Sequence, residues 1–90
     1  MSLNPKSKQA LKAKAHALKP IILIGAQGLT AAVNKEIDRA LHDHELIKIR
    51  IHTEDREAKK TMFQQISLEA QADIVQIIGK VGVFYRKKSD

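Results

Sequence analysis

The sequence predicts an α/β fold, a compact sandwich in which helices pack on a four-stranded mixed sheet in the order α-β-α-β-α-β-β. Three observations predict it. The apolar run 21–24 ends at a Gly-x-x-Gly turn, and a helical pattern follows at once. Residues 46–52 alternate between apolar and polar side chains, which is typical of a half-buried strand. Two short apolar segments with glycines between them close the chain, as in an antiparallel hairpin.

The size and composition indicate one small domain, which we expect to span residues 1–90. The 43% of hydrophobic residues suffice for a modest core. Cysteine is absent, so a disulfide framework and a thiolate metal site are excluded, and a cytoplasmic location is expected. No apolar run approaches the roughly 20 residues of a membrane span, and no secretory signal is present. We therefore expect no membrane partner.

The first helix is predicted over residues 5–18 and is amphipathic and basic. Pro5 suits its first turn, and Leu11, Ala15 and Leu18 recur at helical spacing. Pro20 ends the helix, because a residue that precedes proline avoids helical dihedral angles. An adjacent stripe carries positive charge: Lys8, Lys12, His16 and Lys19. A solvated face over a packed leucine stripe is an alternative explanation of the same pattern.

The next two elements are a strand over residues 20–24 and a helix over residues 30–44. The strand does not alternate, so we expect it to be buried on both faces. Thr30 is the expected N-cap of the helix, because its hydroxyl can accept a hydrogen bond from a free N–H of the first turn. The buried stripe of this helix is Val33, Ile37, Ala40 and Leu41.

The second half of the chain predicts a strand, a helix and a hairpin. In the strand over residues 46–52, three isoleucines face the core, and Lys48, Arg50 and His52 form a basic outer row. A third helix begins after residues 53–55 and runs to about Ala72, with its core side made by Ala58, Met62, Ile66 and Ala70. Strands 74–78 and 83–86 flank a turn at 79–82, and alternation places Phe84 and Tyr85 on opposite faces.

The turn Gly25-Ala26-Gln27-Gly28 has the chemistry of an anion cradle. Two glycines allow a tight bend and a close approach to a partner without Cβ obstruction. The helix that follows directs its free N–H groups and its positive dipole end at the same place, which favours a phosphate. The motif is neither a P-loop nor a dinucleotide fingerprint, because it lacks the Gly-Lys-Ser/Thr sequence and the third glycine. A tight turn required only for chain geometry is the alternative.

The charge is uneven along the chain. The net charge is +6, and residues 1–35 contain six lysines and no acidic residue. Acidic residues concentrate between 36 and 73, and the C-terminal stretch is basic again. If folding gathers the basic segments, the molecule has a basic face and an acidic back, and a nucleic-acid backbone is the first partner to consider. Ordinary surface lysines are the alternative.

Catalysis and metal binding find little support in the residues. There is no cysteine nucleophile, and no serine lies in a nucleophile-elbow pattern. His42 and His44 are two positions apart and cannot share a helix face for a metal. We therefore expect a protein that is not an enzyme and has no metal, cofactor or small-molecule substrate. Aromatic residues amount to 3%, so nucleic-acid binding should rest on backbone and shape rather than base stacking.

The chain resembles the CRM domain family, named for chloroplast RNA splicing and ribosome maturation, in its bacterial stand-alone (YhbY-type) form. The resemblance covers nearly the whole chain in order and is carried by segments 15–20, 24–30, 44–51, 55–57, 75–79 and 84–86. One departure is Lys80-Val81-Gly82-Val83, where the family usually has an apolar strand start. The glycine there is expected to loosen the last hairpin.

The resemblance implies a compact α/β domain similar to the C-terminal domain of bacterial translation initiation factor three. It also implies RNA binding through the GxxG loop, in association with precursors of the large (50S) ribosomal subunit and hence with 23S ribosomal RNA. By carry-over, the RNA-facing loop is Gly25, Ala26, Gln27 and Gly28. Basic residues that match the family pattern are Lys19, Lys48, Arg50, Arg56 and Arg86; Lys8 and Lys12 join them through the charge of the first helix.

The favoured interpretation is thus a monomeric RNA-binding module that acts on structured ribosomal RNA. A protein-interaction adaptor, whose basic face binds an acidic partner, is the second hypothesis; the charge pattern alone does not exclude it, and binding to purified RNA distinguishes the two. An enzyme that acts on a phosphorylated metabolite is the least favoured alternative, because no nucleophile or metal-ligand set is present.

Overall fold

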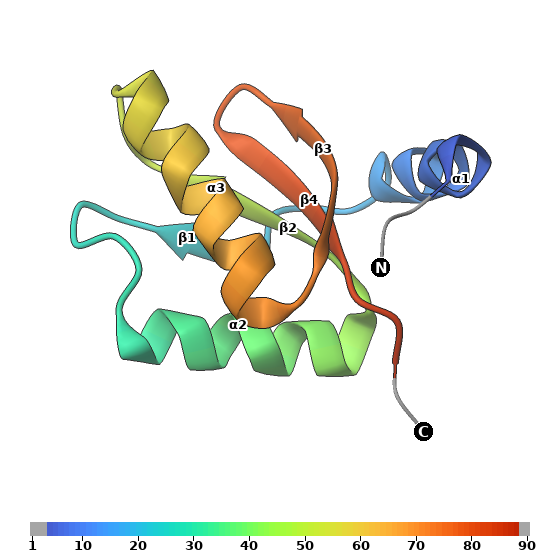
Figure 1. Ribbon diagram of the computed structural model, residues 1–90, viewed down its shortest axis with the longest axis horizontal. Coiled ribbons are helices and arrows are strands. Elements are labelled where there is room, and N and C mark those ends of the chain that lie inside the picture. Colours follow the sequence, from blue (N-terminus) through green and yellow to red (C-terminus); the bar gives the residue numbers. More distant parts are fainter. Residues whose placement is uncertain (1–3, 89–90) are drawn as a thin grey trace.

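The computed structural model describes residues 4–88. The predicted element order is confirmed (Figure 1). In chain order the elements are α1 (Pro5–Ala15), β1 (Ile22–Ile24), α2 (Ala31–His44), β2 (Leu46–Ile51), α3 (Arg56–Ala70), β3 (Asp73–Ile78) and β4 (Val81–Tyr85).

The four strands form one mixed sheet in the order β1-β2-β4-β3. β1 lies parallel to β2, and helix α2 supplies the crossover that a parallel pair needs. β4 lies between β2 and β3 and is antiparallel to both. The edge strands are therefore β1, which precedes the glycine turn, and β3.

Helices α2 and α3 cover one face of the sheet and build the main core. This core joins Ile37 and Leu41 of α2 and Phe63 and Ile66 of α3 to the isoleucines of β1 and β2 and to Phe84. The rings of Phe63 and Phe84 meet at a centroid distance of 5.8 Å and an angle of 47°. The predicted inward faces of α2 and β2 are thus confirmed. Both could be predicted because side-chain periodicity alone determines them.

Helix α1 packs on the opposite face of the sheet and covers only part of it. Its buried residue Ala15, with Leu11 beside it, contacts Val75, Val83 and Tyr85. Phe84 and Tyr85 therefore do lie on opposite faces, as alternation predicts. The small area of this second cluster leaves the rest of the face open.

The helix starts follow the predicted capping chemistry. The Thr30 hydroxyl accepts the Val33 N–H at 3.1 Å, which confirms Thr30 as the N-cap of α2. Asp55 Oδ1 accepts the N–H groups of Glu57 and Ala58 at the start of α3. α1 begins in the same way, because Asn4 Oδ1 accepts the Ser7 N–H at 2.7 Å and Pro5 follows at the first helical position.

The first helix is shorter than predicted, since α1 ends at Ala15 and not at Leu18. The chain tightens after Ala15, where the N–H of Ala17 donates to the carbonyl of Lys14 and that of Leu18 to the carbonyl of Ala15. The carbonyl of Leu18 instead accepts Lys48 Nζ at 3.0 Å. A tertiary contact with β2 thus helps to hold the chain in a link that leads to β1.

The prediction that the first strand is buried on both faces is wrong. β1 has only three residues, and its central Leu23 is 65% exposed while Ile22 and Ile24 are buried. The physical reason is the position of β1 at the sheet edge, where α1 does not reach the outer face. The apolar run 21–24 therefore contributes to one core only, and its outward side chain Leu23 lies on an open apolar surface.

The third helix and the hairpin also differ from prediction at their ends. α3 ends at Ala70 rather than Ala72, because Gln71 adopts a left-handed conformation with φ 53° and the Ala72 N–H bonds back to the Ser67 carbonyl. The hairpin turn contains Gly79 and Lys80 only, and Gly82 lies within β4. Gly82 is buried against Phe63, so it belongs to the packed part of the hairpin and not to its turn.

Candidate nucleic-acid interface

The glycine turn connects the carboxyl end of β1 to the start of α2. The Gly28 N–H donates to the Gly25 carbonyl at 3.0 Å, which closes a four-residue turn. Gly28 has φ 72°, a left-handed conformation that glycine adopts freely and most side chains disfavour. Gly25 needs no such freedom, and a Cβ added to it would meet no atom within 4 Å. Gly25, Ala26 and Gln27 are exposed, so this side of the turn faces solvent.

The amino end of α2 lies directly behind this turn. Thr30 satisfies the Val33 N–H, and the neighbouring Ala31 and Ala32 are exposed. The first N–H groups of a helix have no intrahelical partner, so this end offers donors and a positive dipole to an anion. The His52 N–H donates to the Ile24 carbonyl at 2.9 Å and fixes the base of the turn to β2. The arrangement is compatible with a phosphate at the turn.

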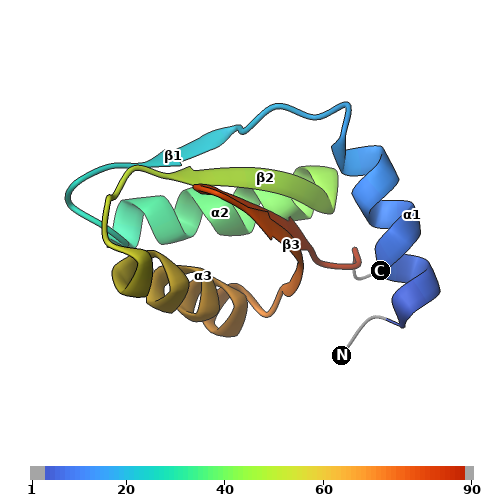
Figure 2. The same ribbon diagram turned by 90° about the horizontal axis from the view of Figure 1, so that it is seen from above.

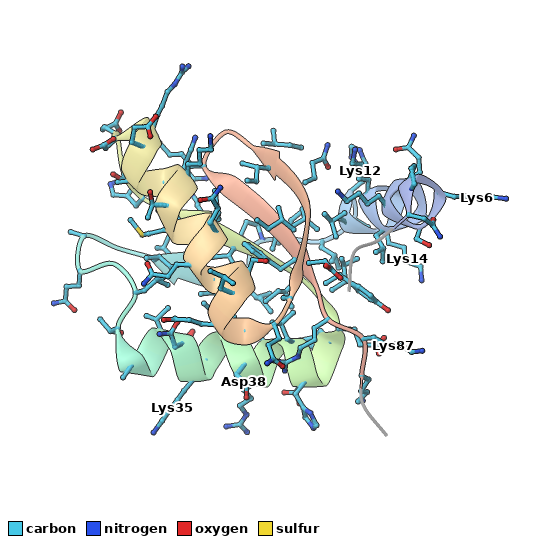
Figure 3. All side chains as sticks on the ribbon, in the orientation of Figure 1. Lys6, Lys12, Lys14, Lys35, Asp38 and Lys87 are labelled. Atoms are coloured by element: carbon cyan, nitrogen blue, oxygen red, sulfur yellow. The ribbon has the colours of Figure 1, made fainter. Side chains whose placement is uncertain are left out.

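A second group of predicted residues gathers between α1 and the open sheet face. Lys12, Lys48 and Arg50 line a cavity of about 330 Å³ there. Figure 3 shows Lys12 on the side of α1 that lies nearest the hairpin, whereas Lys6 points away from the sheet. Lys48 is also held in place by its hydrogen bond to the Leu18 carbonyl.

The glycine turn and helix α1 lie at opposite ends of the molecule, and Lys48 and Arg50 lie on β2 between them. Figures 1 and 2 agree that the turn after β1 and helix α1 are separated along the long axis, which measures 33 Å. Helix α1 therefore does not lie beside the glycine turn. The open sheet face connects the two groups, because Leu23 of β1 is paired with Arg50 of β2.

The remaining predicted basic residues are dispersed. Lys8 lies on α1, Lys19 is exposed in the link to β1, and Arg56 is exposed at the first turn of α3. Arg86 is engaged elsewhere, since its guanidinium donates to Asp38 Oδ1 at 2.7 Å and to the carbonyls of Ala70 and Asp38. The structure thus gives Arg86 a role in joining the chain after β4 to α2 and α3.

The distribution of charge shows a basic side but not an acidic back. Within the described residues 4–88, carboxylates form ion pairs with Lys80 and Arg86 only, so the basic side chains of α1 and the open sheet face are unpaired. The stretch from Pro5 to Leu23 contains no acidic residue. Helices α2 and α3 together carry as many lysines and arginines as acidic residues, so the opposite side is mixed.

The residues around the cavity that were not predicted as site residues include His16, Pro20 and Gln76. His16 is the C-cap of α1 and Pro20 belongs to the link. Both line the cavity because of the way α1 and the link pack on the sheet, which the local sequence does not indicate. Gln76 follows a register shift between Ile74 and Gln76 in β3. A bulge of this kind breaks simple alternation, and alternation was the signal that could have placed Gln76.

Within residues 4–88, no three histidine, aspartate or glutamate side chains are grouped to hold a metal ion. None of the helices between residues 4 and 88 combines the length and apolarity that crossing a bilayer requires.

Fold and surface together define a small α/β domain with an open, basic sheet face and an anion-compatible glycine turn. The family model for the CRS1/YhbY (CRM) domain matches residues 3–86. The chain belongs to the CRM domain family, which confirms the resemblance noted from its motifs.

Relatives and a solved structure agree with this assignment. The chain is 43% identical to an RNA-binding protein of Haemophilus influenzae, over 99% of this chain and 90% of that protein. It is 37% identical to a probable RNA-binding protein of Pseudomonas aeruginosa, over 97% and 84% of the two chains. The solution structure of a hypothetical protein of Staphylococcus aureus matches with a TM-score of 0.85 and 32% identity, over 99% and 93% of the two chains.

Proposed function

We propose that this protein is a non-catalytic RNA-binding module that acts on structured ribosomal RNA. One observation carries the proposal: the molecule has both the glycine turn and, on the α1 side of the sheet, basic side chains that form no ion pair within the described residues. The names of the relatives from two bacteria support RNA as the nucleic acid.

The proposed mechanism divides the contact between the two ends of the molecule. At one end, the turn at Gly25–Gly28 and the start of α2 clamp a backbone phosphate. Arg50 and Lys48 of β2, followed by Lys8, Lys12 and Lys19 at the other end, neutralise further phosphates along the sheet. Arg56 is exposed and extends the contact near the start of α3. Because the long axis of the molecule measures 33 Å, these contacts engage several phosphates of one bound RNA.

The family and the acid-free stretch from Pro5 to Leu23 support a finer assignment. We propose 23S ribosomal RNA in precursors of the 50S subunit as the target, with the protein acting as a single-domain cytoplasmic monomer in subunit assembly. Binding of this kind needs no catalytic group, and its affinity depends on salt through the number of phosphates that are neutralised.

The test compares two nearly isosteric substitutions in the turn. Gly28→Asp and Gly28→Asn impose similar strain, because Asn and Asp both tolerate the left-handed region at φ 72°. Only Asp adds a negative charge where a phosphate is proposed. We expect Gly28→Asp to lose most of the affinity for an RNA fragment of the large subunit, roughly tenfold or more relative to Gly28→Asn. Fluorescence anisotropy measures the affinity, and thermal melting checks the fold.

Equal affinity for the two variants at matched stability would remove the loop from the proposed contact. Strong binding to an acidic protein, with no binding of the unmodified chain to purified RNA, would instead establish the adaptor alternative.

A further inference from the structure

The cavity between α1 and the open sheet face has a composition that the phosphate contacts do not explain. We call it the sheet-face cavity. Its volume is about 330 Å³, within the range of roughly 300–1,000 Å³ that is typical of ligand pockets. It is lined by Lys12, Ala15, His16, Pro20, Lys48, Arg50, Gln76, Ile78, Val81 and Val83.

The lining divides into apolar and polar parts. Ala15, Val81, Val83 and Ile78 contribute apolar surface, and Ile78 remains 59% exposed with no element packed over it. The polar part contains Lys12, Lys48, Arg50 and His16 and no acidic side chain. An occupant with a negative charge and an apolar portion is therefore favoured over a neutral or cationic one.

The remaining polar group is the half-buried side chain of Gln76, which pairs in register with Val83. Its amide offers both a donor and an acceptor, and the edge of a nucleobase presents the same combination. The guanidinium of Arg50 and the imidazole of His16 are planar groups that stack on bases. A plain phosphate would use neither the amide nor the apolar surface.

The cavity also lies on a continuous path from the glycine turn. Strand pairing places Leu23, Arg50, Val81 and Ile78 in one row across the sheet, from the edge strand β1 to the edge strand β3. Leu23 belongs to the strand that ends at the turn and is 65% exposed. A nucleic-acid strand held at the turn can follow this row to the sheet-face cavity.

We propose that the sheet-face cavity accepts one unpaired nucleotide of the bound RNA, with its base against the apolar residues and Gln76 and its phosphate against Lys12 and Arg50. This inference rests on the proposed RNA binding and adds a base-reading site to it. Recognition by the module then includes the identity of one extruded base as well as backbone shape.

The first experiment uses an RNA hairpin with an unpaired loop, derived from the large-subunit fragment, and removes its bases one at a time. The proposal predicts that one abasic position weakens binding about tenfold, while the other abasic positions have little effect. A 4-thiouridine at the sensitive position should cross-link on irradiation to the cavity strands, in peptides that contain residues 76–83. Uniform affinity across all abasic positions would overturn the proposal and leave RNA binding itself intact.

The second experiment tests the amide with a matched pair of variants. Gln76→Leu removes the donor and acceptor from the cavity, and Gln64→Leu makes the same change at an exposed position of α3. We expect Gln76→Leu to reduce the discrimination between bases at the sensitive position, with Gln64→Leu behaving like the unmodified protein. Unchanged discrimination in Gln76→Leu would contradict base reading by this residue. If an acidic peptide competed for the cavity while every abasic RNA bound normally, the cavity would be a peptide site instead.

Discussion

Gly82 shows how a single residue in the sheet controls the packing of the core. A Cβ at this position would approach Phe63 Cε1 to 2.7 Å and Phe84 Cε1 to 2.9 Å. Both rings are fully buried, so neither can move aside easily. The absence of a side chain at Gly82 is therefore what allows α3 to bring Phe63 close to β4.

We predict that Gly82→Ala lowers the free energy of unfolding by about 1–3 kcal/mol, because it overpacks this ring pair. Chemical denaturation measures the change. Gly25→Ala is the control, since a Cβ there meets no atom within 4 Å, and its stability should equal or slightly exceed that of the unmodified protein. Equal stability of both variants would show that the core adapts around β4.

Arg86 illustrates a basic residue whose charge is used within the fold. Its side chain is 23% exposed, whereas that of its partner Asp38 is 69% exposed, so solvent screens the ion pair itself. The hydrogen bonds to the carbonyls of Ala70 and Asp38 are the more important contribution.

We predict that Arg86→Ala lowers the free energy of unfolding by about 1–2 kcal/mol and leaves RNA affinity unchanged within about twofold. Lys87→Ala, at the exposed neighbouring position, should change neither quantity appreciably. Denaturant titration and anisotropy measure the two effects. A large loss of RNA affinity in a normally stable Arg86→Ala protein would return Arg86 to the interface.

At the scale of elements, the β3–β4 hairpin is fastened by contacts from outside it. Lys59 Nζ of α3 donates to the Gly79 carbonyl at 2.7 Å, and the Ile51 N–H donates to the Lys80 carbonyl at 2.8 Å. Lys80 Nζ lies 2.9 Å from Glu54 Oε1. The turn is thus tied to the start of α3, which orients the strand that carries Gln76.

The hydrogen bond from Lys80, followed by the positive charge of Lys80, lowers the pKa of Glu54 below its usual value of 4.5. Because the folded pKa is the lower one, the ionised carboxylate favours the folded state above pH 4.5, and this contribution is lost as the pH falls through the folded pKa. We predict that Lys80→Met returns the Glu54 pKa towards its usual value. An NMR titration of the carboxyl carbon measures it, and an unchanged midpoint would contradict the ion pair.

The elements that periodicity predicted well are those whose signal is local. The start of α2 at Thr30 and the alternation of β2 follow from capping and from side-chain period, and the structure agrees with both. The end of α1 and the exposure of β1 could not be predicted in this way. Both depend on tertiary contacts. Lys48 donates a hydrogen bond to the Leu18 carbonyl, and α1 does not pack over Leu23, which stays exposed.

In the whole molecule, the spatial grouping of the basic residues could not be predicted from the sequence, although the sequence lists every one of them. Lys12, Lys48 and Arg50 come from distant positions in the chain and meet around one cavity. Arg86 has the same charge and lies in another environment, against α2. The separation of the glycine turn from α1 also follows from topology. The predicted site residues therefore extend from the turn, across the open sheet face, to α1 (Figure 2).

The surface from the glycine turn to α1 is proposed to recognise structured ribosomal RNA. Anisotropy titrations of a structured large-subunit RNA fragment, a scrambled RNA hairpin and a DNA duplex, each over a series of salt concentrations, test this recognition. The prediction is that the ribosomal fragment binds more tightly than both controls and remains bound at physiological salt, with a salt slope that reflects the phosphates neutralised. Equal binding of all three ligands that disappears as salt rises would contradict the claim and leave only a non-specific basic surface.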